Sequence, residues 1–83
     1  MIDESDLKFD CTGVRLLMKD GKIEDHDPVE HDNWSIGSGI VLIGNKYEYQ
    51  IDDVEKILNY NLFKEKDCNR FIRKDLDGKV LHG

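Results

Sequence analysis

The side chains best suited to chemistry in this sequence are two histidines that stand among carboxylates. His26 and His31 lie in the stretch Glu24–Asp32, where five of the nine residues are acidic. If Pro28 begins a helical turn, each histidine lies four residues from a carboxylate, and such a set could bind zinc or manganese. Because no cysteine or third histidine lies nearby, we interpret the stretch as a solvated acidic loop. We therefore expect no metal and no cofactor.

The carboxylates of this stretch are better suited to binding a positively charged protein. Residues 1–45 carry four basic and ten acidic side chains and residues 46–83 carry eight of each, so the net charge of −6 belongs to the first half. A protein that binds nucleic acid directly needs a basic stripe, which the sequence does not show. Trp34 follows the acidic stretch, either as a buried anchor or as an exposed interface aromatic. We predict a partner-binding face made of Glu24, Asp25, Asp27, Glu30, Asp32 and Trp34.

The motifs of common enzymes are absent or incomplete in this sequence. None of the three serines, Ser5, Ser35 and Ser38, lies in the G-x-S-x-G frame of a serine hydrolase. The glycines between Gly37 and Gly44 lack the third glycine of a dinucleotide motif and the lysine of a phosphate-binding loop. Such a short chain also has little room for a desolvated pocket. We therefore predict that the protein is not an enzyme.

Length and composition indicate one small domain, residues 1–83. Hydrophobic residues make up 39% of the chain and charged residues 36%, which is too apolar for a disordered acidic tail. No apolar run approaches the roughly 18 residues of a membrane helix, and the N-terminal residues are acidic where a signal peptide is basic. We expect a cytoplasmic protein with no membrane partner, in which Cys11 and Cys68 are free thiols.

Two hairpins are expected in the first two thirds of the chain. The run Val14–Met18 is typical of a strand, and Asp20-Gly21 is a favoured turn before a return strand at Lys22–Glu24. Ile40–Ile43 and Lys46–Ile51 flank Gly44-Asn45, which suits a tight turn with positive φ angles.

The residue pattern in the last third of the chain predicts a helix and a final hairpin. Val54, Ile57, Leu58, Leu62 and Phe63 recur with helical spacing after the capping candidates Asp52 and Asp53. Residues 70–73 and 79–81 then flank an Asp77-Gly78 turn. The predicted fold is α+β, a small antiparallel sheet with one helix from the C-terminal half packed on it.

Half of the chain also resembles a known family of small barrels. Met18-Lys19-Asp20-Gly21-Lys22, followed by Ile51-Asp52-Asp53-Val54-Glu55-Lys56-Ile57, is similar to Sm-like or SH3-like barrels, and most of all to the Rof family of acidic inhibitors of the transcription terminator Rho. The resemblance covers residues 14–57. It implies a small β-barrel as the second possible fold, with residues 54–58 as a closing strand, and an acidic surface that occupies an RNA-binding face of Rho.

These observations predict a non-catalytic acidic protein that docks on a basic, nucleic-acid-binding protein and blocks it. A Rof-like regulator fits this description, and so does a phage-encoded inhibitor such as an anti-CRISPR protein. The absence of alanine, beside eight isoleucines and five asparagines, is typical of an AT-rich genome and fits a phage origin. Two different functions stay open: a metal- or ligand-binding module centred on His26 and His31, and an immunity-type or structural subunit that is acidic only for solubility.

Overall fold

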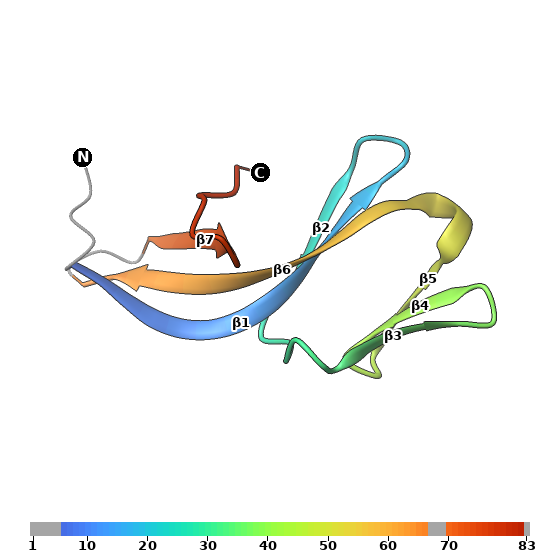
Figure 1. The fold of residues 1–83 in the computed structure, drawn as a ribbon, viewed down its shortest axis with the longest axis horizontal. Coiled ribbons are helices and arrows are strands. Elements are labelled where there is room, and N and C mark those ends of the chain that lie inside the picture. Colours follow the sequence, from blue (N-terminus) through green and yellow to red (C-terminus); the bar gives the residue numbers. More distant parts are fainter. Residues whose placement is uncertain (1–5, 67–69, 83) are drawn as a thin grey trace.

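Strands dominate the computed structural model, which describes residues 6–66 and 70–82. Within these ranges the chain forms seven strands and the short 3-10 helix η2, Ile51–Asp53 (Figure 1). The strands are β1 (Leu7–Met18), β2 (Ile23–His26), β3 (Trp34–Gly37), β4 (Ile40–Ile43), β5 (Tyr47–Gln50), β6 (Val54–Glu65) and β7 (Phe71–Asp75).

The predicted α+β fold is wrong, because 62% of the described residues are in strands and the expected helix is not formed. The residues assigned to that helix lie in β6 and pair with β1 along most of its length. Both faces of β6 carry apolar side chains over residues 57–63. Ile57 packs against the main hydrophobic core, whereas Tyr60 and Leu62 are buried outside that core cluster. A strand with two apolar faces reproduces the spacing of an amphipathic helix, and its β-branched and aromatic residues favour the strand.

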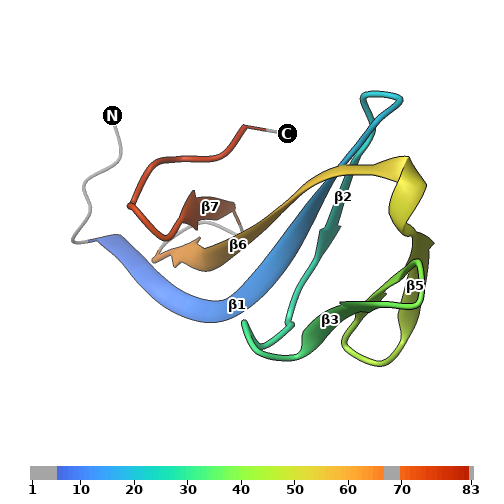
Figure 2. The same ribbon diagram turned by 45° about the vertical axis from the view of Figure 1, so that its right-hand side comes forward.

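The strands form two antiparallel sheets, one of four strands in the order β2-β1-β6-β7 and one of three in the order β3-β4-β5. The long strands β1 and β6 are paired from Leu7↔Glu65 to Met18↔Val54, with a register shift between Phe9 and Cys11. Figures 1 and 2 show the three-stranded sheet, η2 and the β1–β2 turn at one end of this ribbon, and β7 near the other.

The core lies between the two sheets. Val14 and Leu16 of β1 and Val41 and Ile43 of β4 are fully buried against one another. Val29, from the loop between β2 and β3, is buried with them, and its backbone N–H donates to the carbonyl oxygen of Thr12 at 2.9 Å. This contact brings the acidic stretch against the middle of β1.

The predicted hairpins are confirmed. The turn at Asp20-Gly21 joins β1 to β2. The connection from β4 to β5 is residues 44–46, one residue longer than the predicted two-residue loop Gly44-Asn45, and the φ angles of Gly44 and Asn45 are 61° and 57°. β7 and the following segment form the last hairpin through the Lys74↔Val80 bridge. Sequence reasoning missed β3, whose residues Trp34–Gly37 were assigned to no element.

Candidate protein-binding surface

The acidic stretch does not lie free in solvent along its whole length. Glu24, Asp25 and His26 belong to β2, and no helical turn begins at Pro28, which follows a cis peptide bond. The carboxylate of Asp27 accepts hydrogen bonds from Tyr60 on β6 and Arg73 on β7. The predicted binding residues therefore divide into a group bound within the fold and a group that is exposed.

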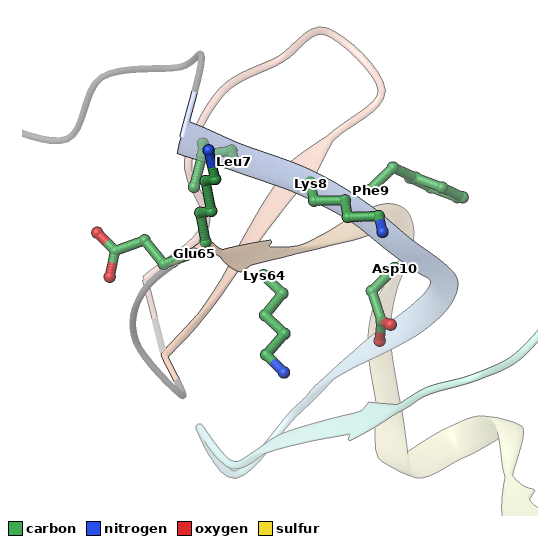
Figure 3. Close-up of a pocket in the computed structure, with 7 residues that line it drawn as sticks. Leu7, Lys8, Phe9, Asp10, Lys64 and Glu65 are labelled. Atoms are coloured by element: carbon green, nitrogen blue, oxygen red, sulfur yellow. The ribbon is translucent and has the colours of Figure 1, made fainter.

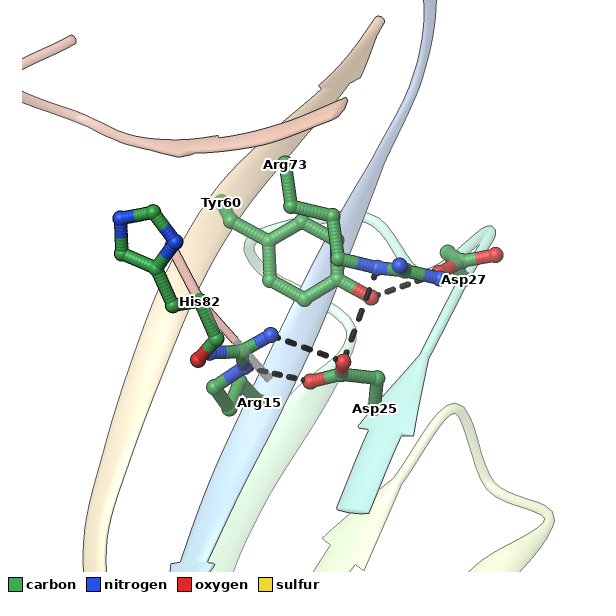
Figure 4. A network of polar contacts seen from close by, with 6 residues as sticks. All are labelled: Arg15, Asp25, Asp27, Tyr60, Arg73 and His82. Carbon is green, nitrogen blue, oxygen red and sulfur yellow. Dashed lines mark hydrogen bonds and ion pairs between the residues drawn. The ribbon is translucent and has the colours of Figure 1, made fainter. Parts of the chain in front are cut away.

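Asp25 forms an ion pair with a buried arginine. Arg15, 4% exposed, lies opposite Asp25 in the β1–β2 ladder, and its guanidinium donates to the two carboxylate oxygens at 2.7 and 3.0 Å (Figure 4). A third donation, 2.9 Å long, reaches the carbonyl oxygen of His82. A bidentate carboxylate compensates much of the desolvation of a buried guanidinium, so Asp25 has a structural role.

Asp27 forms a second internal network with Tyr60 and Arg73. One of its carboxylate oxygens accepts the Tyr60 hydroxyl at 2.7 Å and the Arg73 guanidinium at 2.9 Å (Figure 4). Burial by itself raises the pKa of Asp27, but these two hydrogen bonds and the positive charge of Arg73 outweigh burial and hold the pKa below its ordinary value. Burial and the hydrogen bond to Asp27 raise the pKa of Tyr60, so its hydroxyl stays a donor.

Gly13 is the residue that lets Tyr60 take this position. The two residues are paired between β1 and β6, and the Tyr60 ring lies across the glycine. A Cβ atom at Gly13 would lie 2.5 Å from Cζ of the ring and 2.6 Å from its hydroxyl oxygen. Only a residue without a side chain fits beneath the ring.

The two histidines contact aromatic and backbone groups. Nε2 of His26 is hydrogen-bonded to the Tyr49 hydroxyl. The centre of the His26 ring lies 4.3 Å from the centre of the Tyr47 ring. Nε2 of His31 is 3.1 Å from the carbonyl oxygen of Tyr60. In the part of the chain that the structure describes, no three His, Cys, Asp or Glu side chains gather in a way that could hold a metal ion.

Cys11 is the one thiol within the described residues, since Cys68 lies outside them. It is free, as predicted, and half-buried. Partial burial and the nearby carboxylates of Asp10 and Asp27 raise the pKa of its thiol. A raised pKa makes the nucleophilic thiolate scarce at neutral pH.

Trp34 is an anchor of the second sheet. Its indole Nε1–H donates to the side-chain oxygen of Asn59 on β6 at 3.0 Å, and its ring packs against the buried core. The side chain remains partly exposed. It therefore joins the two sheets and also faces solvent.

The exposed carboxylates among the predicted binding residues lie at one end of the molecule. Residues 19–56, which we call the acidic end, carry four basic and ten acidic side chains, so they hold the net charge of −6. They comprise β2, the three-stranded sheet, η2 and the start of β6, which Figures 1 and 2 show together. The predicted residues Glu30 and Asp32 are exposed here, and Glu24 is half-exposed.

Sequence reasoning missed several further exposed carboxylates of the acidic end. Asp52 and Asp53 are exposed on η2, Glu55 on β6 and Glu48 on β5. The sequence shows Asp52-Asp53 plainly, but we assigned these residues to a helix cap. Asp52 and Asp53 lie instead on the 3-10 helix η2, none of whose residues is buried.

The opposite end has a different charge pattern. A hollow of about 680 Å³ lies against β1 and β6 there, lined by Leu7, Lys8, Phe9, Asp10, Lys64, Glu65 and Lys66. Lys8 and Lys64 are paired across the ladder, and Figure 3 shows the Asp10 carboxylate on the same side of it. Cations and anions are mixed in this hollow, so it provides a natural control for the acidic end.

Comparison of the chain with protein-family models, curated proteins and solved structures finds no match. Among the described residues, no helix is long and apolar enough to cross a membrane. The functional proposal therefore depends on the geometry and charge of the surface itself.

Proposed function

We propose that this protein is a non-catalytic inhibitor that docks through its acidic end on a basic surface of a nucleic-acid-handling protein. The supporting observation is the exposure of Glu30, Asp32, Asp52, Asp53 and Glu55 at the acidic end, where carboxylates outnumber basic side chains even when Asp25 and Asp27, which are paired with arginines, are left out. No ion pair within the described residues uses these five side chains. Their charge is available to an external partner.

The mechanism is competition for cationic sites. Basic protein surfaces in a cell serve largely to bind phosphates, and carboxylates can occupy the positions that phosphates would take. The field of a −6 protein speeds its encounter with such a surface, and salt weakens that attraction because the Debye length is only about 10 Å at 0.1 M. We place this activity in the cytoplasm, as a Rof-like regulator or as a phage-encoded inhibitor such as an anti-CRISPR protein.

The test compares two sets of charge substitutions in a pull-down from bacterial lysate. The acidic-end variant carries Glu30→Gln, Asp32→Asn, Asp52→Asn, Asp53→Asn and Glu55→Gln, and the matched control carries Lys8→Gln, Lys64→Gln and Lys66→Gln. Asp25 and Asp27 are left unchanged because the fold uses them.

We expect the unmodified protein and the control to retain the same basic protein at low salt. Added RNA or duplex DNA should release it, and the acidic-end variant should not retain it. Retention that is equal in the acidic-end variant, or that nucleic acid does not reverse, would refute the proposal.

A further inference from the structure

A groove with apolar walls lies where β3 faces the first part of β6. Trp34, Ile36 and Val41 of the three-stranded sheet line one side, and Ile51, Val54 and Ile57 line the other. The volume of the groove is about 240 Å³. A cavity of about 150 Å³ accommodates benzene, whereas drug-sized ligands occupy about 300 Å³ or more, so this groove suits one or two apolar side chains.

The groove is open to solvent through two isoleucines. Ile36 is 52% exposed and Ile51 is 38% exposed, although both belong to the apolar walls. Exposed apolar side chains around a recess are typical of a binding site, because their burial by a partner stabilises the complex.

The edge of β3 beside the groove can accept another strand. β3 pairs with β4 alone among the described strands. The N–H of Gly44 donates to the carbonyl oxygen of Asn33, so these two residues form a hydrogen-bonded pair. Hydrogen-bonded and non-hydrogen-bonded pairs alternate along the antiparallel β3–β4 ladder, which makes Trp34↔Ile43 and Ile36↔Val41 non-hydrogen-bonded pairs. By that alternation, the backbone groups of Trp34 and Ile36 are directed away from β4, toward the free edge.

A strand added to this edge would point alternate side chains toward the groove. Residues paired with Trp34 and Ile36 carry their side chains on the same face of the sheet as these two, which is the face that lines the groove. An extended segment would then gain backbone hydrogen bonds from β3 and bury an apolar side chain at the same time.

The charge around the groove indicates the chemistry of that segment. Glu55 and Lys56 line the groove, and the exposed Asp52 and Asp53 lie in the chain between its lining residues Ile51 and Val54, so carboxylates outnumber cations in this segment. An extended segment with basic residues on either side of an apolar one complements this rim.

We propose that an extended, basic segment of the partner protein adds as a strand to the edge of β3 and inserts an apolar side chain into the groove. This inference rests on the proposed function and specifies the contact that makes the docking selective. The acidic carboxylates attract the partner, and the groove selects a segment within it.

Selection from a library of random nine-residue peptides, displayed on phage, tests the proposal. Ile36→Ser removes an apolar wall of the groove, and the matched control is Leu76→Ser, at a leucine that is 60% exposed beyond β7. Both substitutions remove mostly exposed side chains, so the denaturation midpoints should stay close to that of the unmodified protein.

We expect the unmodified protein and Leu76→Ser to enrich peptides with lysine or arginine on both sides of an apolar residue. A synthetic peptide of that consensus should change the fluorescence emission of Trp34, the only tryptophan. Ile36→Ser should weaken its binding by about tenfold or more.

Two outcomes separate this inference from the proposed function. If no such motif is enriched, or if Ile36→Ser binds the consensus peptide like Leu76→Ser, the groove is not the docking site, and capture of a basic protein through the acidic end is unaffected. If the acidic-end variant, which lacks Asp52, Asp53 and Glu55, enriches the motif equally, the apolar groove still binds peptide, but both the attraction of basic flanks by this rim and the role of the exposed carboxylates are overturned.

Discussion

Two groups of carboxylates in this protein have the same chemistry and opposite surroundings. Asp25 and Asp27, at the end of β2, lie against arginines and a tyrosine, with side chains 19% and 22% exposed. Asp52 and Asp53, on η2, are exposed and belong to an element that buries nothing. The first pair holds strands together, whereas the second is available to a partner. A count of charges along a sequence therefore overestimates the charge that a surface offers.

The largest effect should come from breaking the buried ion pair. Asp25→Asn leaves the Arg15 guanidinium buried without its counter-charge, which should lower the free energy of unfolding by about 3 kcal/mol or more. Asp52→Asn, the control on η2, should change it by less than about 0.5 kcal/mol. Urea denaturation of both variants measures the difference. Equal effects would remove the distinction between the two groups.

A second substitution tests the close packing of Tyr60, the partner of Asp27, against β1. Gly13→Ala forces the Cβ atom into the Tyr60 ring and should destabilise the fold by about 1–3 kcal/mol, as overpacking does. The control is Gly37→Ala, where the new Cβ atom would meet no atom within 4 Å. Chemical denaturation midpoints compare the two. If the alanines prove equally tolerable, the close approach of Tyr60 to β1 is not required.

The smallest expected effect is on how the stability of the fold depends on pH. Because the pKa of Asp27 in the folded state lies below its ordinary value of 3.8, its carboxylate contributes stability that is complete above that pH and is lost as the pH falls through the folded pKa. Tyr60→Phe removes one of the hydrogen bonds responsible. It should cost about 1 kcal/mol at neutral pH and reduce the further loss below about pH 4. Urea midpoints measured at several pH values test this, and parallel curves for the two proteins would contradict it.

The hairpins could be predicted from the sequence because their signals are local. Asp20-Gly21 and Gly44-Asn45 are turn residues whose backbone requirements do not depend on the rest of the chain. The exact register could not be predicted in this way. A two-residue turn at Asp20-Gly21 would place Arg15 opposite His26, whereas the observed connection, residues 19–21, places Arg15 opposite Asp25.

The rest depends on contacts between distant residues. Arg73 lies 46 positions from Asp27, and no local pattern brings them together. The spacing of Ile57, Leu58 and Leu62 suits a helix as well as a strand with two apolar faces, and pairing with β1 and β7 decides for the strand. The groove could not be predicted from the sequence either, because its two walls come from segments that only the folded chain brings together. Sequence reasoning therefore identified the acidic character of the surface but assigned part of it to residues that the fold uses internally.

The ladder between β1 and β6 also sets the order in which the protein can fold. Its closest pair, Met18↔Val54, joins residues 36 positions apart, and its farthest, Leu7↔Glu65, joins residues 58 positions apart. The hairpins β1–β2, β3–β4 and β4–β5 need only local chain and can form first, whereas the ladder requires closure of a long loop. Refolding should therefore take about milliseconds to seconds, as in other β-proteins rich in distant contacts. During synthesis, strands β1 to β5 emerge before β6, and β1 can form its long ladder only once β6 has followed.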